Sequence, residues 1–445
     1  MSKKFCVKVY GCQMNVYDAD RVRTVLCGRG WEEVPEAEAD IIMITGCSVR
    51  AKAEQKVWSE MGLYENSWRK NQKPMVALTG CIAQRLGERA LNRFPYVRLV
   101  AGPRHIGLLP DAIEQVTEHP KSRINLLDTD PREFHSLDFD SDNITIKREN
   151  KYKAYVTIAH GCDNFCTYCI VPYVRGRFVS RKPEEIFAEI NMLIKDGVKE
   201  ITLLGQNVNS YGKDFHSDIN FAWLLREVAH TEGIKRVRFV TSLPQDFTHE
   251  IIDVMASEET VCPSLNLPIQ SGSDRILKLM NRKYTRAEYI EKVRLTRERV
   301  PGLGLTTDLI VGFPGETEQD YQDSLSALQE IRFDMVHSAA YSEREGTPAA
   351  TMDGALPVEL RLERLTKLNE LQDKITREIN DKLTGQEFEI LVDGPAPKGE
   401  NLLQGRTPSD KVVIFEGKKN LLGQFVKVKI TDAEAWCLHG ELVEA

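Results

Sequence analysis

The sequence predicts an α/β protein with three parts: an N-terminal doubly wound parallel-sheet domain, a central partial (β/α)6 barrel and a small antiparallel C-terminal β-barrel. Three observations predict this organisation. The first part alternates strand-like and helix-like stretches, the second repeats a strand–helix rhythm six times, and the third holds only short alternating strands. The predicted domains cover residues 1–127, 151–382 and 383–445, and a polar, charge-rich linker covers residues 128–150.

Length and composition are those of a multidomain globular protein. The chain has 445 residues, 42% of them hydrophobic and 28% charged, which is too long for one ordinary domain and typical of soluble proteins. No stretch approaches the roughly 18 apolar residues of a membrane span, and the N-terminus lacks the apolar segment of a secretory signal. We therefore expect a cytoplasmic monomer with no membrane partner. The net charge of −7 argues against a uniformly basic surface but permits a local basic groove.

The first domain shows four buried-strand patterns separated by helical ones. The expected strands are Phe5–Tyr10, Asp40–Thr45, Pro74–Thr79 and Val97–Ala101. The expected helices are Asp18–Cys27, Ala51–Ser67 and Ala83–Asn92. Because strands joined through helices pair in parallel, their carboxyl ends should meet at one edge of the sheet.

The second domain continues the rhythm with longer elements. Its expected strands are Ala154–Ala159, Glu200–Leu204, Arg236–Thr241, Ser264–Ile269, Gly304–Val311 and Met335–Tyr341. Its expected helices are Pro183–Lys195, Phe221–His230, Phe247–Ser257, Tyr284–Glu298, Thr317–Ile331 and Val358–Lys382. Six such units form a partial barrel whose functional site lies at the carboxyl ends of the strands. The third domain should contain strands at Glu387–Val392, Lys411–Phe415 and Gln424–Ile430.

Cys162, Cys166 and Cys169 form a compact triplet directly after the first predicted barrel strand. Three thiolates with three- and two-residue spacers can bind three irons of a 4Fe–4S cube and leave the fourth iron open to a small molecule. Zinc, with His160 as a fourth ligand, is the alternative. Structural zinc sites usually bring two separated ligand pairs, so the spacing favours an open iron–sulfur site.

This triplet, with Tyr168 before the last cysteine, resembles the signature of the radical S-adenosylmethionine enzymes. The resemblance implies that the methionine part of the cofactor chelates the open iron and that reductive cleavage yields a 5′-deoxyadenosyl radical. Polar or glycine-rich turns follow other barrel strands, and their backbone N–H groups suit a carboxylate or ribose. We expect S-adenosyl-L-methionine contacts from Tyr168, Gly205, Gln206, Asn207, Gln270, Ser271 and Val311. Ordinary turn chemistry is the alternative.

A second triplet is dispersed through the first domain. Cys12, Cys47 and Cys81 each follow a glycine at the end of a predicted strand. In a parallel sheet these ends are adjacent, and glycine lets the backbone approach closely, so three distant thiolates can converge on one metal cluster. Three unrelated buried cysteines are the alternative. We interpret the remaining residues Cys6, Cys27, Cys262 and Cys437 as packing residues.

Two cysteine triplets together resemble the radical S-adenosylmethionine methylthiotransferases, with a C-terminal TRAM-like barrel. The stretches 11–15, 169–177 and 204–209 are similar to the MiaB-like, tRNA-modifying branch. The resemblance implies two 4Fe–4S clusters and a methylthio transfer to C2 of N6-isopentenyladenosine beside the anticodon, giving 2-methylthio-N6-isopentenyladenosine. It also implies the tRNA anticodon stem-loop and an electron donor such as a flavodoxin or ferredoxin as partners. Beyond the six cluster ligands we assign no catalytic residue.

Basic side chains adjoin the first triplet. Arg175, Arg177, Arg181 and Lys182 lie on a stretch without acidic residues, with Tyr173 and Phe178 interleaved, and are our candidates for RNA binding. A solvated loop is the alternative. A second basic stretch runs from Arg275 to Arg286, and the C-terminal barrel offers lysines from Lys411 to Lys429.

Two other functions fit parts of the sequence. The same chemistry could act on N6-threonylcarbamoyladenosine in tRNA or on an aspartate of a ribosomal protein. A non-catalytic, metal-stabilised RNA-binding protein belongs to another class. It predicts closed metal sites, whereas both cysteine triplets leave one coordination position free.

Overall fold

The computed structural model describes residues 3–49, 51–127 and 146–443. The first domain is a six-stranded, fully parallel sheet in the order β2-β1-β3-β4-β5-β6. Its strands are β1 (Lys4–Tyr10), β2 (Glu32–Glu33), β3 (Ile41–Gly46), β4 (Met75–Thr79), β5 (Val97–Ala101) and β6 (Ile124–Leu126). Its helices are α1 (Gln13–Gly28), α2 (Ala51–Asn71), α3 (Cys81–Arg93) and α4 (Leu109–Glu118). Because β1 lies between β2 and β3, the order of the strands reverses there, which confirms the doubly wound sheet.

Buried apolar strands build this sheet. Every residue of β3 and β4 is buried, as expected for parallel strands covered on both faces. Helix α1 begins at Gln13, five residues before the predicted start, because Cys12 is its extended N-terminal cap. Helix α3 begins at Cys81 itself. The expected linker at residues 128–150 falls mostly outside the described residues.

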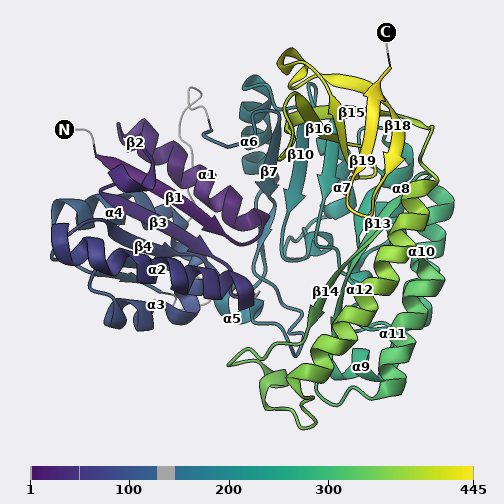
Figure 1. Cartoon of the computed structure of the whole chain (residues 1–445), viewed down its shortest axis with the longest axis horizontal. Helices are drawn as coiled ribbons and strands as arrows, with labels where there is room; N and C mark the ends of the chain where they lie inside the picture. Colours follow the sequence, from purple (N-terminus) through teal and green to yellow (C-terminus); the bar gives the residue numbers. More distant parts are fainter. Residues whose placement is uncertain (1–2, 50, 128–145, 444–445) are drawn as a thin grey trace.

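The central domain lies beside the N-terminal sheet domain (Figure 1) and contains six parallel barrel strands in chain order. They are β7 (Lys153–Thr157), β10 (Glu200–Leu204), β11 (Arg236–Phe239), β12 (Ser264–Asn266), β13 (Gly304–Val311) and β14 (Met335–Ala340). Strands β7, β10 and β11 pair in one sheet and β12, β13 and β14 in another, while a bridge from Val237 to Val261 joins the two. The predicted partial (β/α)6 barrel is confirmed. A short antiparallel pair, β8 (Ala159–His160) and β9 (Val179–Ser180), flanks the cysteine loop.

Helices cover this barrel and give it one continuous apolar core. They are α5 (Val171–Arg175), α6 (Pro183–Lys195), α7 (Phe221–Ala229), α8 (His249–Ser257), α9 (Asp274–Leu279), α10 (Arg286–Arg299), α11 (Glu318–Ile331) and α12 (Val358–Asp381). The short helices α5 and α9 were not predicted. Within the described ranges, no helix is both long enough and apolar enough to cross a membrane.

The C-terminal domain is a closed five-stranded barrel in the order β15-β16-β17-β19-β18. Its strands are β15 (Glu387–Pro395), β16 (Leu402–Arg406), β17 (Val412–Glu416), β18 (Phe425–Ala433) and β19 (Leu438–Leu442). The pair β17–β19 is parallel and the others are antiparallel. Strands β16 and β19 were missed because each contains a glycine, which weakens a strand signal. Gly405 is needed where a side chain would meet the Leu391 carbonyl, 2.4 Å from an added Cβ.

The two outer domains contact opposite ends of the central barrel strands. At the amino end of β11, Arg236 donates to the carbonyls of Arg406 and Glu389, at 2.8 and 2.6 Å, in the C-terminal barrel. At the carboxyl end of β10, Leu204 packs against Met14 of the first domain. The first domain therefore meets the end of the barrel at which the cysteine loop lies.

Candidate functional site

Three strand ends of the first domain converge at Cys12, Cys47 and Cys81. The thiols of Cys12, Cys47 and Cys81 lie close enough to influence one another's pKa. The pKa of Cys12 is lowered because its thiolate accepts a hydrogen bond from Cys47 and lies near Arg175. Burial raises the pKa of Cys81, an effect that Arg175 opposes.

The glycines before these cysteines permit the convergence. A Cβ on Gly11 would lie 3.1 Å from the Cβ of Cys47, and one on Gly46 would lie 2.8 Å from Ile82. Gly80 has a φ of +82°, and a Cβ there would lie 2.9 Å from Thr45 Oγ1. The carboxyl ends of β1 and β3, which carry Cys12 and Cys47, flank the place where the strand order reverses. Ligands usually bind at this place in such sheets.

Arg175 connects this triad to the central domain. Its guanidinium is 4% exposed, donates to Cys81 Sγ at 3.2 Å and lies 3.6 Å from Asp18 Oδ2. Burial raises the pKa of Asp18 to about 6, with Arg175 acting in the opposite direction. Around the other sulfurs, Cys12 Sγ is 3.4 Å from Asn15 Oδ1, and the Val49 amide donates to Cys47 Sγ at 3.2 Å.

The second triad lies on the loop after β8. The Cys162 amide donates to the Gly176 carbonyl at 3.2 Å, and the Cys169 amide donates to the Cys166 carbonyl at 2.9 Å. Gly161 has a φ of +69°, and a Cβ there would lie 2.0 Å from the Arg177 carbonyl, so only glycine fits. Burial and the neighbouring Cys166 raise the pKa of Cys169 to about 12.

A buried arginine also contacts this triad. Arg282 is 6% exposed and donates to Cys166 Sγ at 3.4 Å, while its other nitrogens bind Tyr284 and the Pro268 carbonyl. Asn164 donates to Cys162 Sγ at 3.3 Å. Each triad thus has a guanidinium in contact with one of its sulfurs. This positive charge suits a negatively charged, thiolate-ligated cluster, and a hydrogen bond to sulfur helps to set the reduction potential of such a cluster. The sequence did not identify either arginine as a sulfur contact, since both stood among other basic residues.

The distances between the cysteine sulfurs help to distinguish a site for one metal ion from a site for a multi-iron cluster. Two thiolates on one tetrahedral zinc lie about 3.8 Å apart, because the Zn–S bond is about 2.3 Å. We compared groups of three metal-ligand side chains among the described residues, in which all donor atoms lie within 4.8 Å of one another. Neither cysteine triad forms such a group. At least one pair of sulfurs in each triad therefore lies more than 4.8 Å apart, which is wider than two ligands of one zinc ion. The pKa of His160, the candidate fourth ligand, is lowered by burial and by nearby arginines.

The expected S-adenosylmethionine contacts lie on the same rim as the second triad. Gly205, Gln206 and Asn207 follow β10, Val311 ends β13, and Gln270 pairs with Leu309 of β13. Tyr168 packs in a small apolar cluster with Phe313 and Tyr341. Ser271 is fully buried and lies 3.5 Å from Ser324.

Buried polar atoms without a described partner gather at this rim. They are Thr157 Oγ1, Asn207 Oδ1, Ser242 Oγ and Tyr341 Oη, each at or just beyond the carboxyl end of a different barrel strand. Buried polar atoms normally hydrogen-bond, so several together indicate a polar ligand. The residues therefore fit a cofactor rich in hydroxyl, amino and carboxylate groups. Of these four residues, Thr157, Ser242 and Tyr341 were not predicted from the sequence as cofactor contacts.

The four candidate RNA-binding side chains separate into two pairs. Arg175 is buried against Cys81, and the side chain of Arg181, 12% exposed, pairs with Glu189 at 2.8 Å. Helix α1 of the first domain covers both guanidiniums, so they contact other protein groups. We therefore no longer propose Arg175 and Arg181 as RNA contacts. Arg177 and Lys182 are exposed. In the C-terminal barrel, Lys411 pairs with Asp334 of the central domain.

Two exposed aromatic side chains stand beside the second triad. Phe165, between Cys162 and Cys166, is 40% exposed, and Tyr173 is 48% exposed. Their rings meet edge to face at 6.4 Å, and the Arg177 guanidinium lies 5.8 Å from the Phe165 ring centre. Phe165 was missed in the sequence because it lies inside the cysteine motif.

Comparisons with known proteins match all three domains. Residues 4–102 match "Uncharacterized protein family UPF0004", residues 156–328 match "Radical SAM superfamily" and residues 381–443 match "TRAM domain". The tRNA-2-methylthio-N(6)-dimethylallyladenosine synthase of Moorella thermoacetica is 45% identical over 99% of both chains. The protein of the same name from Aquifex aeolicus is 43% identical over 100% of this chain and 99% of its own.

A solved structure with a similar fold is the radical S-adenosylmethionine methyltransferase TsrM from Kitasatospora setae. The TM-score is 0.56 with 15% identity, covering 79% of this chain and 74% of that chain. At this identity the likeness concerns the fold alone.

Proposed function

The chain belongs to the family of tRNA-2-methylthio-N(6)-dimethylallyladenosine synthases, and on that premise we propose that it adds a methylthio group to C2 of N6-isopentenyladenosine beside the tRNA anticodon. It is a radical S-adenosylmethionine methylthiotransferase. We assign one 4Fe–4S cluster to Cys12, Cys47 and Cys81 and the other to Cys162, Cys166 and Cys169. When bound, the clusters supply the electron that cleaves S-adenosylmethionine and the sulfur that is transferred.

The observation that carries this proposal is the bridge that α5 makes between the triads. The helix begins two residues after Cys169, and its last residue, Arg175, donates to Cys81 Sγ at 3.2 Å. At about 1.5 Å per residue, five helical residues span only about 7.5 Å. Cys81 also packs against Ile170 and Val174. The two triads therefore lie at the two ends of one short helix, and this closeness supports the proposal that both act on one substrate base.

The protein's own residues position the reactants and exclude water. The start of α1 covers the carboxyl end of β10, where Met14 and Tyr17 pack against Leu204. Gln206 on the barrel rim contacts the Met14 sulfur. Such a covered rim keeps a radical away from solvent while the rim's polar atoms hold the cofactor. A one-electron donor such as a flavodoxin or ferredoxin completes the proposed set of partners.

We propose that the anticodon loop enters at Phe165 and Tyr173. Exposed aromatic rings stack on unpaired bases, and nearby cations bind phosphates, which Arg177 and Lys182 would supply. Arg177 is held by Asp163, whose Oδ1 accepts from its Nε at 2.7 Å. Both side chains remain partly exposed, so a phosphate can replace or join this pair.

Substituting Tyr173→Ala is expected to weaken tRNA binding by about 5- to 150-fold, since stacking contributes about 1–3 kcal/mol per base. Fluorescence anisotropy with an anticodon stem-loop measures the affinity. Formation of 5′-deoxyadenosine without tRNA should not change. Val179→Ala, also an exposed apolar position at 39%, is the matched control and should bind normally. Equal affinities for both variants would contradict the stacking role.

Mass analysis of tRNA nucleosides tests the function itself. A strain lacking this gene should accumulate N6-isopentenyladenosine and lose its 2-methylthio derivative, and the gene should restore it. If this derivative persists while 2-methylthio-threonylcarbamoyladenosine or the ribosomal-protein modification disappears, the alternative substrate is the correct one.

A further inference from the structure

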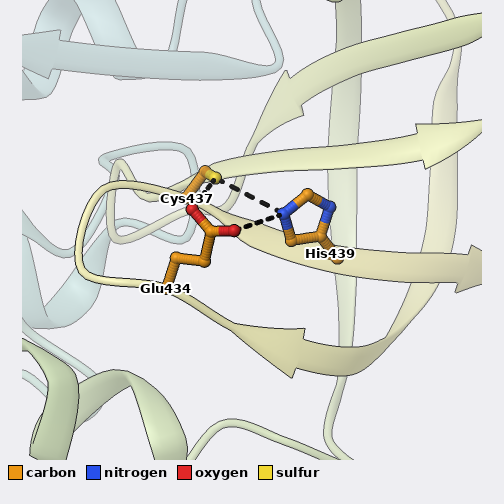
Figure 2. A group of neighbouring side chains, drawn as sticks. All are labelled: Glu434, Cys437 and His439. Atoms are coloured by element: carbon orange, nitrogen blue, oxygen red, sulfur yellow. Dashed lines mark hydrogen bonds and ion pairs between the residues drawn. The ribbon is translucent and has the colours of Figure 1, made fainter. Parts of the chain in front are cut away.

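Glu434, Cys437 and His439 meet at the hairpin between β18 and β19 of the C-terminal barrel. Cys437 Sγ lies 3.7 Å from Glu434 Oε2 and 3.7 Å from His439 Nε2, and the latter lies 3.5 Å from Glu434 Oε1. Figure 2 shows the three side chains turned toward one another. The interpretation of Cys437 as a packing residue is wrong, because its sulfur is partly exposed and faces two polar groups.

These distances fit tetrahedral coordination by one metal ion. With Zn–S of about 2.3 Å, Zn–N of about 2.0–2.1 Å and Zn–O of about 2.0–2.2 Å, tetrahedral ligands lie about 3.4–3.6 Å apart. Among the described histidines, cysteines, aspartates and glutamates, this is the group of three whose possible metal-binding atoms all lie within 4.8 Å of one another.

Both contacts of Cys437 Sγ are within hydrogen-bonding range, but the contact between His439 and Glu434 is longer than a close hydrogen bond. A charge-assisted bond from a protonated histidine to a carboxylate measures about 2.7–2.9 Å, which is shorter than the 3.5 Å between His439 and Glu434. The local charge is also negative, because Asp432, the backbone neighbour of His439 on the adjacent strand, adds a second carboxylate near Cys437. A thiolate, an imidazole and a carboxylate in negative surroundings favour a divalent cation.

We propose that Glu434, Cys437 and His439 form a zinc site whose fourth position is open to solvent. The hairpin prearranges it. The Glu434 amide donates to the Cys437 carbonyl at 2.8 Å, and Leu438, fully buried in the barrel, directs the neighbouring His439 outward. Zinc accepts this mixture of sulfur, nitrogen and oxygen ligands.

The site lies where the barrel joins the central domain. Asn380, 4% exposed near the end of α12, donates to the Glu434 carbonyl at 2.7 Å and accepts from Lys411 Nζ at 2.8 Å. Lys411 also pairs with Asp334 at 2.5 Å, just before β14. Zinc would therefore fix the hairpin that α12 holds and stiffen the attachment of the proposed RNA-binding barrel, far from both cysteine triads.

The test uses full-length protein with both iron–sulfur clusters loaded, so that the cluster cysteines are occupied. The protein is incubated with zinc alone and desalted, and bound zinc is measured by elemental analysis and zinc-edge X-ray absorption. We expect about one zinc per chain, with one sulfur at about 2.3 Å and nitrogen or oxygen neighbours at about 2.0 Å. Cys437→Ser, His439→Ala and Glu434→Gln should each weaken binding by more than about 10-fold.

Cys27→Ser is the matched control, since Cys27 is also a free, partly buried cysteine but lies on α1. It should retain zinc like the wild type. Zinc should also slow amide exchange of residues 431–440 in wild type and not in Cys437→Ser. Failure to retain zinc would overturn the proposal, as would retention unaffected by Cys437→Ser or a spectrum with three or more sulfur neighbours.

Discussion

Replacing Cys12, Cys47 and Cys81 together by alanine is expected to halve the iron content and abolish methylthio transfer while preserving cleavage of S-adenosylmethionine. Two 4Fe–4S clusters contain about eight irons, so about four should remain. The physical reason is that the central triad and its rim of polar atoms belong to another domain and do not use these sulfurs. Iron, acid-labile sulfide and 5′-deoxyadenosine are measured after anaerobic reconstitution.

The reciprocal variant separates the two sites. Changing Cys162, Cys166 and Cys169 to alanine should also leave about four irons but should eliminate both 5′-deoxyadenosine and the methylthiolated product. Cys6→Ala with Cys27→Ala is the control and should retain both clusters, because neither sulfur belongs to a triad. If the N-terminal variant retained all of its iron, our assignment of the second cluster would be wrong.

Glu189→Gln is expected to loosen the contact between the first and central domains by about 3–5 kcal/mol. Glu189, 3% exposed on α6, accepts from Arg181 at 2.8 Å, from Arg21 at 3.1 Å and from the Tyr17 hydroxyl at 3.1 Å. The amide would remove the carboxylate that Arg21 and Arg181 share, while Arg181 retains the more distant Glu185 at 3.8 Å. Hydrogen exchange of α1 and α6 near pH 7 measures the loss. Glu185→Gln is the control, because Glu185 lies on the same helix but its side chain is 46% exposed. It should change the free energy of the domain contact by less than about 0.5 kcal/mol.

The same network predicts a pH dependence. Burial alone would raise the pKa of Glu189, but Arg21 and Arg181 outweigh it and lower the pKa below its ordinary value. A carboxylate with a depressed pKa stabilises the folded state above its unfolded pKa of about 4.3, and this contribution disappears as the pH falls through the folded pKa. The difference between wild type and Glu189→Gln should therefore be constant from neutral pH to about 5 and shrink below that. A difference that grew in acid would contradict this role.

Much of the fold could be predicted because local patterns decide it. The predicted bounds of helix Pro183–Lys195 and strand Gly304–Val311 agree with the structure at both ends. Both have strong apolar periodicity with clear boundaries. Strand Leu438–Leu442 lacked such a signal because Gly440 interrupts it, and its place beside β17 arises only when the barrel closes.

The sequence by itself predicted where the two cysteine triplets lie. Cys12, Cys47 and Cys81 follow successive parallel strands whose carboxyl ends meet at one edge, and the other triplet lies on a single loop after the first barrel strand. Only the tertiary structure decided which charged side chains are interior. Arg175 and Arg177 are two residues apart, yet the first is buried against Cys81 and the second is 56% exposed. It also brought together Glu434, Cys437 and His439. The reason is that burial depends on which elements pack across domains, and local periodicity carries no information about contacts between distant segments.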